Sequence, residues 1–464
     1  MTDADKPAFL QKLRTNVGAT GTPFRARDAV NQPMIRHWCD AMGDANPNYT
    51  DPAFAAAGPH GGIVAPPTML NAWTMAGNIP RPVDPSDPQR SATALLDAAG
   101  FVGVVASNCE HVYRRYLRPG DVITGTQKLV DVSEEKQTAL GVGHFVTTET
   151  EYHDHHGEHV GSMFFRILKF RPGTGRSSNN GSDGGARPKR PRPSMNADSA
   201  WFWEGCRKHE LRVQTFADGS HHFPPLVRNP KTGEIPSEKQ WVVSSGKGRL
   251  HSYTVVHYPQ VPAFDYPLVV GLVELDEGVR LVTNVVDCTR DQVEIGMPLE
   301  VSWLDSDDDV TLPVFRPAPQ PRRETTLVYD DVNVGDRLPL FPIAITPTLI
   351  VSTAIASRDY QDVHHDRDLA QRKGSKDIFM NILTSSGLSG RYISDWAGPN
   401  AVFKSLKLRL GAPNYPYDTM TMSGSVSNKD LIDGEGVVTV SYQGINSLGA
   451  HVTGTAELAL PVKH

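Results

Sequence analysis

Apolar side chains recur at helical spacing in two stretches that lie far apart in the chain. The first stretch starts at Asp28, a suitable helix N-cap, and its apolar residues share one helix face: Val30, Met34, Ile35, Trp38 and Met42. The second stretch starts at Thr346, another suitable N-cap, with Pro347 in the first helical turn. Its apolar side is formed by Leu349, Ile350 and Ala354. The pattern therefore predicts two similar amphipathic helices, one near each end of the chain.

The same order of elements follows each of these helices. A more apolar helix is predicted over residues 66–76 in the first part and over 382–396 in the last part, where Gly387 and Gly390 would allow another backbone to approach closely. Alternating strands come next. Both parts end in a strand, a turn and a strand, with turn residues at matching places, at residues 156–168 and 448–460. A buried helix followed by an antiparallel meander is the order of a hot-dog fold, so we expect an α+β protein with two such domains.

The stretch between the two repeats has a different pattern. Short strands separated by turn residues, such as PLVVGLVEL and PLEVSWLD, predict a small β-barrel. Residues 171–196 are rich in Gly, Ser, Asn and Pro, and residues 316–324 are rich in Pro and Arg, so both stretches predict linkers. The basic residues of the first linker are interpreted as solvated charge rather than a docking patch. The predicted domains are therefore 1–170, 197–315 and 325–464.

Composition excludes several classes of protein. The formal net charge is -6 and the pI is about 6.3, which argues against a nucleic-acid binder or a polybasic membrane protein. The first residues have no apolar core of a signal peptide, and no run approaches the ~18 apolar residues of a membrane span. The four cysteines form no CxxC pair, which argues against a disulfide framework or a thiolate zinc site: Cys39, Cys109, Cys206 and Cys288. We expect a soluble cytoplasmic protein.

Two short segments, 44–49 and 359–364, carry the candidate chemistry. Each has an Asp five residues before an aromatic ring, just after the amphipathic helix, and the ring is Tyr49 in the first and His364 in the second. An Asp and a His that converge on one water can add that water to a polarised double bond, whereas a Tyr at neutral pH is a much poorer partner. We therefore expect one catalytic pair, Asp359 and His364, and one degenerate copy. The non-catalytic alternatives are that Asp359 is only a carboxylate at a helix terminus beside an exposed His364, and that Asp44 structures its loop.

The segments Gly43–Pro47 and Arg118–Asp121 resemble the MaoC-like family of hot-dog enoyl-CoA hydratases and dehydratases. The last part resembles the same family more loosely, because Gln361 and Asp362 replace its Asn and Pro. The middle part resembles the acyl-CoA-associated OB-fold family, in the segments 202–214 and 267–281 and at Ile295-Gly296-Met297. This order of domains, together with residues 377–384, resembles a fusion of the two subunits of bacterial steroid side-chain enoyl-CoA hydratases.

This resemblance implies several functional properties. The substrate would be a bulky steroid side-chain enoyl-CoA thioester, with no other cofactor and no metal. The OB-fold would dock a thiolase-like aldolase, and the chain would form a homodimer. The OB-fold family usually carries a small zinc ribbon, but none of the aligned positions is a Cys here, so we expect a ribbon without metal: Phe216, Gly219, Asn229 and Thr232.

Further site residues follow from the expected position of the central helix. Backbone N–H groups at its start, near Asn381 and Ile382, are suited to stabilise the thioester oxygen as it gains enolate charge. Ser385 and Ser386 would line the pocket, although packing explains them equally well. In the degenerate half, a shifted or shortened helix beginning at Pro66-Pro67 would make room for a bulky acyl group in a cleft shared by both halves.

Other interpretations stay open. The same chemistry could act on a fatty or aromatic enoyl-CoA, or the chain could be a non-catalytic acyl-CoA-binding scaffold. A nucleic-acid-binding OB-fold is disfavoured by the acidic run 305–309, because such modules use basic grooves. The His-rich stretch 152–159 resembles a metal site but is better explained as a solvated hairpin turn.

Overall fold

The computed structural model describes residues 5–78, 84, 87–175, 188–237 and 240–463 of the chain. The chain divides into two compact units, each described here by itself. The first unit comprises residues 1–179, 321–339 and 343–464, and the second comprises 180–320 and 340–342. Among the described residues, no helix combines the length and the apolar character needed to cross a membrane.

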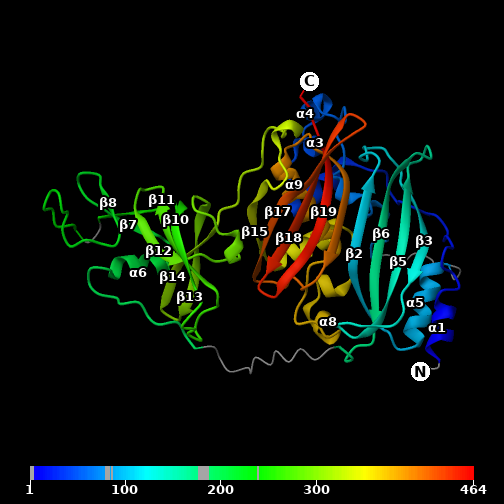
Figure 1. The fold of residues 1–464 in the computed structure, drawn as a ribbon, viewed down its shortest axis with the longest axis horizontal. Helices are drawn as coiled ribbons and strands as arrows, with labels where there is room; N and C mark the ends of the chain where they lie inside the picture. The colour runs from blue at the N-terminus through cyan, green and yellow to red at the C-terminus, as the bar shows by residue number, and fades with distance from the viewer. Residues whose placement is uncertain (1–4, 79–83, 85–86, 176–187, 238–239, 464) are drawn as a thin grey trace. The chain divides into compact units, whose positions relative to one another are not determined.

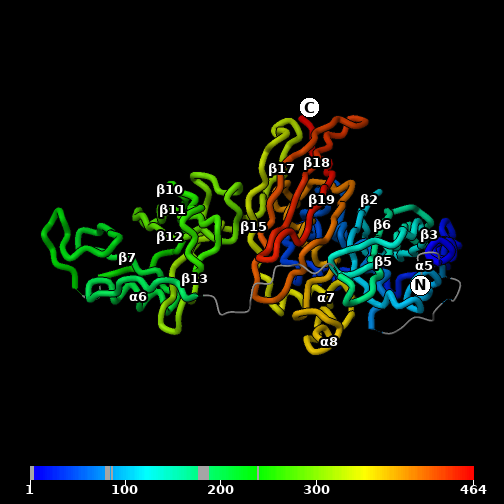
Figure 2. Tube along the Cα trace, turned by 60° about the horizontal axis from the view of Figure 1, so that its bottom comes forward, coloured from blue at the N-terminus to red at the C-terminus, as the bar shows by residue number. Residues whose placement is uncertain are grey.

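One antiparallel sheet runs through the whole first unit (Figures 1 and 2). Strand β2 of the N-terminal half pairs directly with β16 of the C-terminal half, from Val112 opposite Ser405 to Asn108 opposite Arg409. The two hot-dog domains therefore pair edge to edge within one chain, which leaves neither junction strand exposed. The strands of this sheet, in spatial order, are β1 (Phe24–Arg25), β3 (Thr124–Val132), β5 (Val142–His153), β6 (His159–Phe170), β2 (Gly103–Tyr113), β16 (Val402–Leu410), β19 (Gly449–Leu460), β18 (Glu435–Asn446), β17 (Asp418–Ile432) and β15 (Arg337–Ile345), with β4 (Lys136–Gln137) beside β5.

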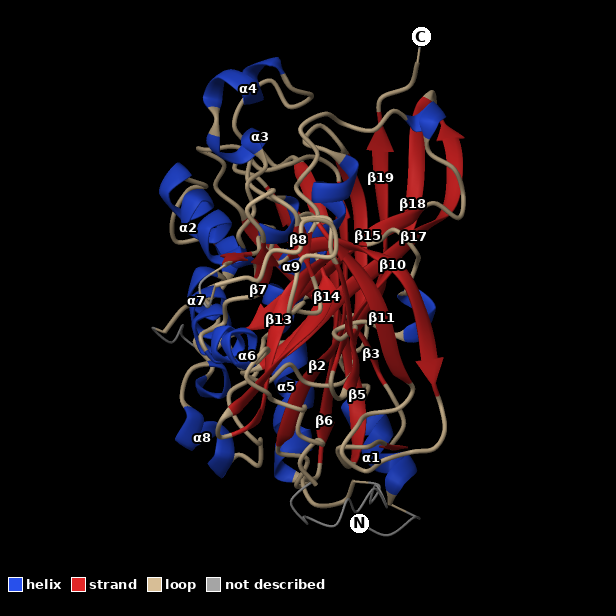
Figure 3. Cartoon of the chain, turned by 90° about the vertical axis from the view of Figure 1, so that its left-hand side faces the viewer, coloured by secondary structure: helices blue, strands red, loops and turns tan. Residues whose placement is uncertain are grey.

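The two predicted amphipathic helices are present and lie on the same side of the sheet (Figure 3). Helix α7 (Pro347–Ala356) is capped by Thr346, as predicted. Helix α2 (Gln32–Met42) begins later than predicted, because Asn31, not Asp28, accepts the hydrogen bond from Met34 N. Short helices follow each of them: α3 (Pro47–Thr50) and α4 (Pro52–Ala57) after α2, and a 3-10 turn η5 (Asp362–His364) and α8 (Arg367–Arg372) after α7. Two further helices, α1 (Lys6–Leu13) and α5 (Pro88–Ala98), pack over the far end of the sheet.

Helix α9 (Ile382–Ala397) is the buried central helix of the C-terminal half, as predicted. Its two glycines allow close packing against the N-terminal half. A Cβ at Gly387 would lie 2.8 Å from the sulfur of Met42, and one at Gly390 would lie 2.8 Å from Cγ2 of Thr68. Larger residues at these positions would push the two halves apart.

The prediction of a helix over residues 66–76 is wrong. This buried segment forms two 3-10 turns, η1 (Pro67–Met69) and η2 (Ala72–Thr74). The N–H groups of Met69, Leu70, Thr74 and Met75 each donate to the carbonyl three residues earlier. Pro66 has an extended ψ of 132°, as expected of a residue that precedes a proline, and Met75 is extended again. Only the eight residues 67–74 therefore remain for a helix, and the two 3-10 turns within them are separated at Leu70–Asn71. In its described residues, the N-terminal half consequently lacks a continuous central α-helix.

The second unit is a closed barrel, as predicted for the middle of the chain. Its five-stranded sheet has the order β12 (Arg280–Asn284), β11 (Leu268–Leu275), β10 (Lys247–Val256), β13 (Pro298–Asp307) and β14 (Val310–Pro317). A parallel bridge between Val285 and Phe315 joins the two ends of this order. Helix α6 (Ala200–Arg207) packs on the barrel, where Phe202 and Cys206 belong to the apolar core.

A three-stranded sheet of β8 (His221–His222), β7 (Arg212–Thr215) and β9 (Trp241–Val243) lies where the zinc ribbon was expected. Asn229, only 1% exposed, connects its two turns. The Asn229 amide donates to Asp218 at 3.1 Å, and its oxygen accepts from the N–H groups of Lys231 and Thr232. These hydrogen bonds link segments that a bound zinc would join in a Cys-containing ribbon.

Two basic residues before the barrel, Lys189 and Arg192, are exposed to solvent, as predicted, and also form ion pairs. Lys189 and Arg192 form ion pairs with Asp307, and Arg192 also binds Asp309 at 2.6 Å. The acidic run at the β13–β14 turn is therefore partly neutralised by the segment that precedes the barrel. These pairs are exposed, so they contribute little stability. The predicted linker residues 176–187 lie outside the described part of the chain.

Candidate active site

The turn after helix α7 brings the side chains of Asp359 and His364 together. Arg358 has a φ of 59°, a left-handed conformation, and the N–H of Asp359 donates back to the Ala354 carbonyl at 2.9 Å. His364 follows in the 3-10 turn η5. Both side chains are buried, and Asp359 Oδ2 lies 3.5 Å from His364 Nε2. The strained turn thus places a carboxylate and an imidazole side by side in an enclosed site.

The hydrogen bonds of His364 determine which of its ring nitrogens can act. Nδ1 lies 2.7 Å from the carbonyl oxygen of Phe379, which only accepts, so Nδ1 carries the proton. Burial lowers the pKa of His364 below its usual value, although Asp359 and the Phe379 carbonyl oppose this effect. The neutral ring therefore directs the lone pair of Nε2 toward Asp359. Two acceptors that face each other do not bond directly, but one water can donate an O–H to each of them.

Asn381 fixes the carboxylate from the other side. Its amide nitrogen donates to Asp359 Oδ2 and to Ser357 Oγ, each at 3.0 Å, while its oxygen accepts from Thr384 N as the N-cap of α9. The sequence pointed only to the backbone of Asn381 and not to this side chain. The first turn of α9 lies beside the pair, and its N–H groups lack carbonyl partners within the helix. The predicted oxyanion donors Asn381 and Ile382 therefore belong to the same corner of the fold as Asp359.

We expect Asn381→Ser to separate the two roles of this side chain. Serine can still cap α9, so the cap itself is kept. Its hydroxyl is too short to hold Asp359 and Ser357, and the buried acceptors left unpaired should lower the free energy of unfolding by about 1–3 kcal/mol. Losing a hydrogen bond to a charged group should lower kcat/KM by about 10- to 100-fold. Steady-state kinetics and thermal melts measure the two effects.

Thr346→Ala is the matched control, since it removes the N-cap of α7 without touching the pair. That variant should lose about 1 kcal/mol of stability and keep its kcat/KM. An Asn381→Ser enzyme with unchanged kcat/KM would show that Asn381 does not position the carboxylate.

The two predicted pocket serines have different surroundings. Ser385 Oγ lies 2.8 Å from His451 Nε2, and His451 Nδ1 donates to the Ala412 carbonyl. Burial lowers the pKa of His451 to about 4, so the ring is neutral and accepts the hydroxyl proton of Ser385. Ser386 Oγ is buried and has no hydrogen-bond partner among the described residues. Sequence reasoning missed His451, whose only signal was its place in the last strand.

The degenerate motif fastens the N-terminal half to the far end of α9. Asn46 donates to Ser394 Oγ and to the Pro399 carbonyl, and Asn48 donates to the same carbonyl at 2.7 Å. Asp44 accepts from Asn46 N, and burial raises its pKa to about 6. Burial also raises the pKa of Tyr49 well above its usual value, so this phenol stays protonated. These contacts support the loop-structuring interpretation of the motif.

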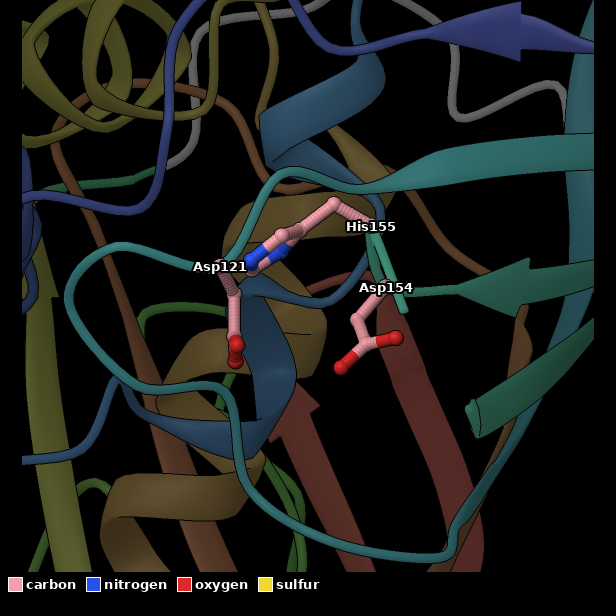
Figure 4. Close-up of side chains that lie close together, drawn as sticks. All are labelled: Asp121, Asp154 and His155. Atoms are coloured by element: carbon pink, nitrogen blue, oxygen red, sulfur yellow. The ribbon is translucent and has the colours of Figure 1, made fainter. Parts of the chain in front are cut away.

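The His-rich turn contributes to an acidic group in which Asp121, Asp154 and His155 approach one another (Figure 4). Arg115 already occupies it. The guanidinium donates to Asp121 at 2.7 Å and to Asp154 at 2.8 Å, and its Nε binds Glu158. His155 Nδ1 accepts from Val122 N. The cluster is thus a hydrogen-bonded support for the β5–β6 turn rather than an open metal site.

Comparisons with known families agree with this architecture. The family models that match are a MaoC like domain over residues 333–447, a FAS1-like dehydratase domain region over 18–163, and the C-terminal OB-fold domain of ChsH2 over 241–304. A solved MaoC-like dehydratase shares the fold, with a TM-score of 0.54 and 16% identity over 97% of this chain and 100% of its own.

Two relatives from Mycobacterium tuberculosis are the subunits of one enzyme, 3-oxo-4,17-pregnadiene-20-carboxyl-CoA hydratase. The alpha subunit is 43% identical over 64% of this chain and 95% of its own length. The beta subunit is 56% identical over 27% of this chain and 95% of its own length. The chain therefore belongs to the MaoC-like enoyl-CoA hydratases, with counterparts of the alpha and beta subunits of this relative joined in one polypeptide.

Proposed function

We propose that this enoyl-CoA hydratase adds water across the 2,3 double bond of a steroid side-chain enoyl-CoA, at Asp359 and His364. The observation that carries the proposal is the pair of buried acceptor atoms 3.5 Å apart at the start of helix α9. A water held by both atoms has its own oxygen lone pairs free to face a substrate.

The chemistry divides into three parts. Asp359 and His364 orient the water, and the pair takes one of its protons while the remaining hydroxide bonds to the β-carbon. The electron pair of the double bond moves to the thioester oxygen, where N–H groups of Asn381 and Ile382 stabilise the enolate. The α-carbon then receives a proton from the pair, which restores the site. Water is consumed and no other reactant is needed.

We infer that the acyl group of the substrate is bulky from the conformation of the N-terminal half and from the names of the relatives. The two relatives are named for a steroid thioester. In this chain, 3-10 turns after Pro66-Pro67 replace the central helix of the degenerate half. A cleft shared by both halves, lined by these prolines and by Ser385 and Ser386, would take a ring system that a second central helix would obstruct.

The proposed protein partner is a thiolase-like aldolase that accepts the β-hydroxyacyl product. The match of the barrel to the ChsH2 OB-fold family supports this role for residues 197–315. A homodimer is also proposed. Because both hot-dog domains already pair inside one chain through β2 and β16, a second copy would have to bind another surface.

A two-substrate panel tests the proposal. We expect the enzyme to hydrate a steroid enoyl-CoA with a three-carbon side chain at least 100-fold more efficiently than crotonyl-CoA, measured as kcat/KM by loss of enoyl-thioester absorbance. A preference for crotonyl-CoA or for a fatty or aromatic enoyl-CoA would retain the hydratase and reject the steroid assignment. Binding of the steroid thioester without turnover would favour the acyl-CoA scaffold.

A further inference from the structure

Arg358, the residue before Asp359, has an unfavourable backbone conformation. Its φ is 59°, and its counterpart in the degenerate motif, Gly43, has a φ of 65°. Glycine adopts this left-handed conformation readily, whereas a residue with a Cβ is strained in it. The second motif therefore carries an arginine at a position where a glycine would suit the turn better. Strained residues of this kind cluster at functional sites, where the side chain has a use that offsets the strain.

A guanidinium lies beside each of the two motif turns, and the two groups come from opposite sides of the contact. In the degenerate half, a Cβ at Gly43 would lie 2.5 Å from Nη1 of Arg391 on helix α9. In the other half, Nη2 of Arg358 lies 3.5 Å from the Cβ position of Gly77. Residues 76 and 391 are related by the same offset along the chain as the two motifs. The arrangement is therefore nearly symmetric, with arginine and glycine exchanged.

The two guanidinium groups differ in their partners. Arg391 donates to the Met42 carbonyl at 2.8 Å and pairs with Asp395 at 3.4 Å, so its donors are used within the protein. Across the described residues, the guanidinium of Arg358 makes no hydrogen bond and no ion pair, although the residue is only partly exposed. This group is always charged and carries five N–H donors. A partly buried charge is costly without a partner, which favours an anion from outside the chain.

The position of the Arg358 guanidinium relates it to the outer part of the substrate. Asp359 is 6% exposed, whereas the next residue, Tyr360, is 39% exposed. The Tyr360 ring lies 3.9 Å from the Cβ position of Gly77, which the guanidinium also contacts. The two neighbours of Asp359 in the chain therefore meet where the turn reaches solvent. The anionic groups of a CoA thioester are its phosphates, and their charge keeps them on the solvent side of a buried reaction site.

We propose that the Arg358 guanidinium binds a phosphate group of the coenzyme A part of the substrate, and that the strained turn is retained for this contact. Arginine suits the role because its planar fork of donors matches the oxygens of a phosphate. Arg358 is thus a substrate-binding residue that anchors the coenzyme next to Asp359. The inference rests on the proposed function and deepens it, because it names the residue that holds the coenzyme rather than the acyl group.

The test compares one steroid enoyl group carried on coenzyme A and on pantetheine, which has no phosphate. We expect the wild type to prefer the CoA thioester by about 10- to 100-fold in kcat/KM, as expected of hydrogen bonds between charged groups. Arg358→Gly should lose most of this preference. Its kcat/KM should fall on the CoA thioester, mainly through a higher KM, and should stay at the wild-type value on the pantetheine thioester.

Arg358→Gly should also raise the melting temperature, because glycine relieves the left-handed strain. Asp433→Gly is the matched control, since Asp433 also has a positive φ, of 51°, but lies in the turn between β17 and β18. It should melt at a higher temperature and keep wild-type kinetics on both thioesters. If Arg358→Gly does not fold, Arg358→Gln provides the second variant. It keeps the Cβ, removes the charge and should lose the same preference.

A folded variant that still prefers the CoA thioester as the wild type does would overturn the inference. Equal losses on both thioesters would also overturn it, because the guanidinium would then act on the acyl group or on the fold. Neither result would affect the proposed hydratase function. By contrast, a wild type inactive on both thioesters would reject the proposed steroid hydratase itself, and the inference with it.

Discussion

Asp359→Asn should reduce the hydration rate by about 10³-fold, within the range expected when an acid–base group is lost. The asparagine has nearly the same shape and can still meet the Asn381 side chain. It cannot accept a proton from water, and its amide nitrogen would compete for the Nε2 lone pair of His364. Single-turnover kinetics with the steroid enoyl-CoA measure the chemical step directly, and the KM should change little because the acyl contacts are intact.

Asp44→Asn is the matched control for that experiment, because Asp44 is the counterpart of Asp359 in the degenerate half. We expect near wild-type kinetics. Since burial raises the pKa of Asp44 to about 6, the folded state disfavours its ionised form, and its contribution to stability falls as the pH rises from about 4 to 6. A neutral amide should therefore leave the protein no less stable at pH 7. Equal losses of activity in both variants would contradict a single catalytic site.

The parts of the site that the sequence predicted are those fixed by local structure. Thr346 caps α7, a turn of defined length follows, and the Asp and the His five residues apart must then lie close together. The echo of this arrangement at residues 44–49 made the pattern recognisable. Likewise, Gly387 and Gly390 on an apolar helix could be read as a packing surface, although the atoms that approach them belong to side chains, including Met42 and Thr68, rather than to another backbone.

The contacts that the sequence could not reveal join segments that are distant along the chain. His451 reaches Ser385 across 66 residues, and the Asn381 side chain reaches Asp359 across 22. The prediction for 66–76 was wrong because its apolar composition suits a buried helix and a buried 3-10 turn equally well. The proline pair carried the signal that should have decided the question, since Pro66 cannot continue a helix into Pro67.

The single-chain arrangement has a consequence for how the two halves divide their roles. The β2–β16 pairing and the hydrogen bonds from Asn46 and Asn48 hold the degenerate motif against the C-terminal end of α9. The proposed catalytic pair lies at the opposite, N-terminal end of the same helix. One helix thus receives structural support at one end and lies beside the proposed catalytic pair at the other. Asn46 and Asn48 therefore have a structural role that does not require a histidine at position 49.

His364→Asn should lower kcat by at least 100-fold. An asparagine amide placed near the Nδ1 position can still donate to the Phe379 carbonyl, so the turn should be retained. The atom that faces Asp359, Nε2, is removed, and the water then has one acceptor instead of two. His365→Asn is the matched control, because this neighbouring exposed ring contacts the Tyr360 carbonyl and not the catalytic pair. It should keep the wild-type rate.

The pH dependence tests the same residue by another route. Because burial lowers the pKa of His364, the ring is neutral at pH 7, and activity should fall only as the pH drops below the usual value of 6.5 and through the lowered pKa. Protonated Nε2 would donate to Asp359 and take the place of the water. The wild type and His365→Asn should both show this acid limb in kcat/KM, at a slightly higher pH in the variant because the charge of His365 contributes to the lowered pKa of His364. His364→Asn should lack the limb. An identical acid limb in all three enzymes would assign the titration to another group and remove His364 from the proton-transfer role.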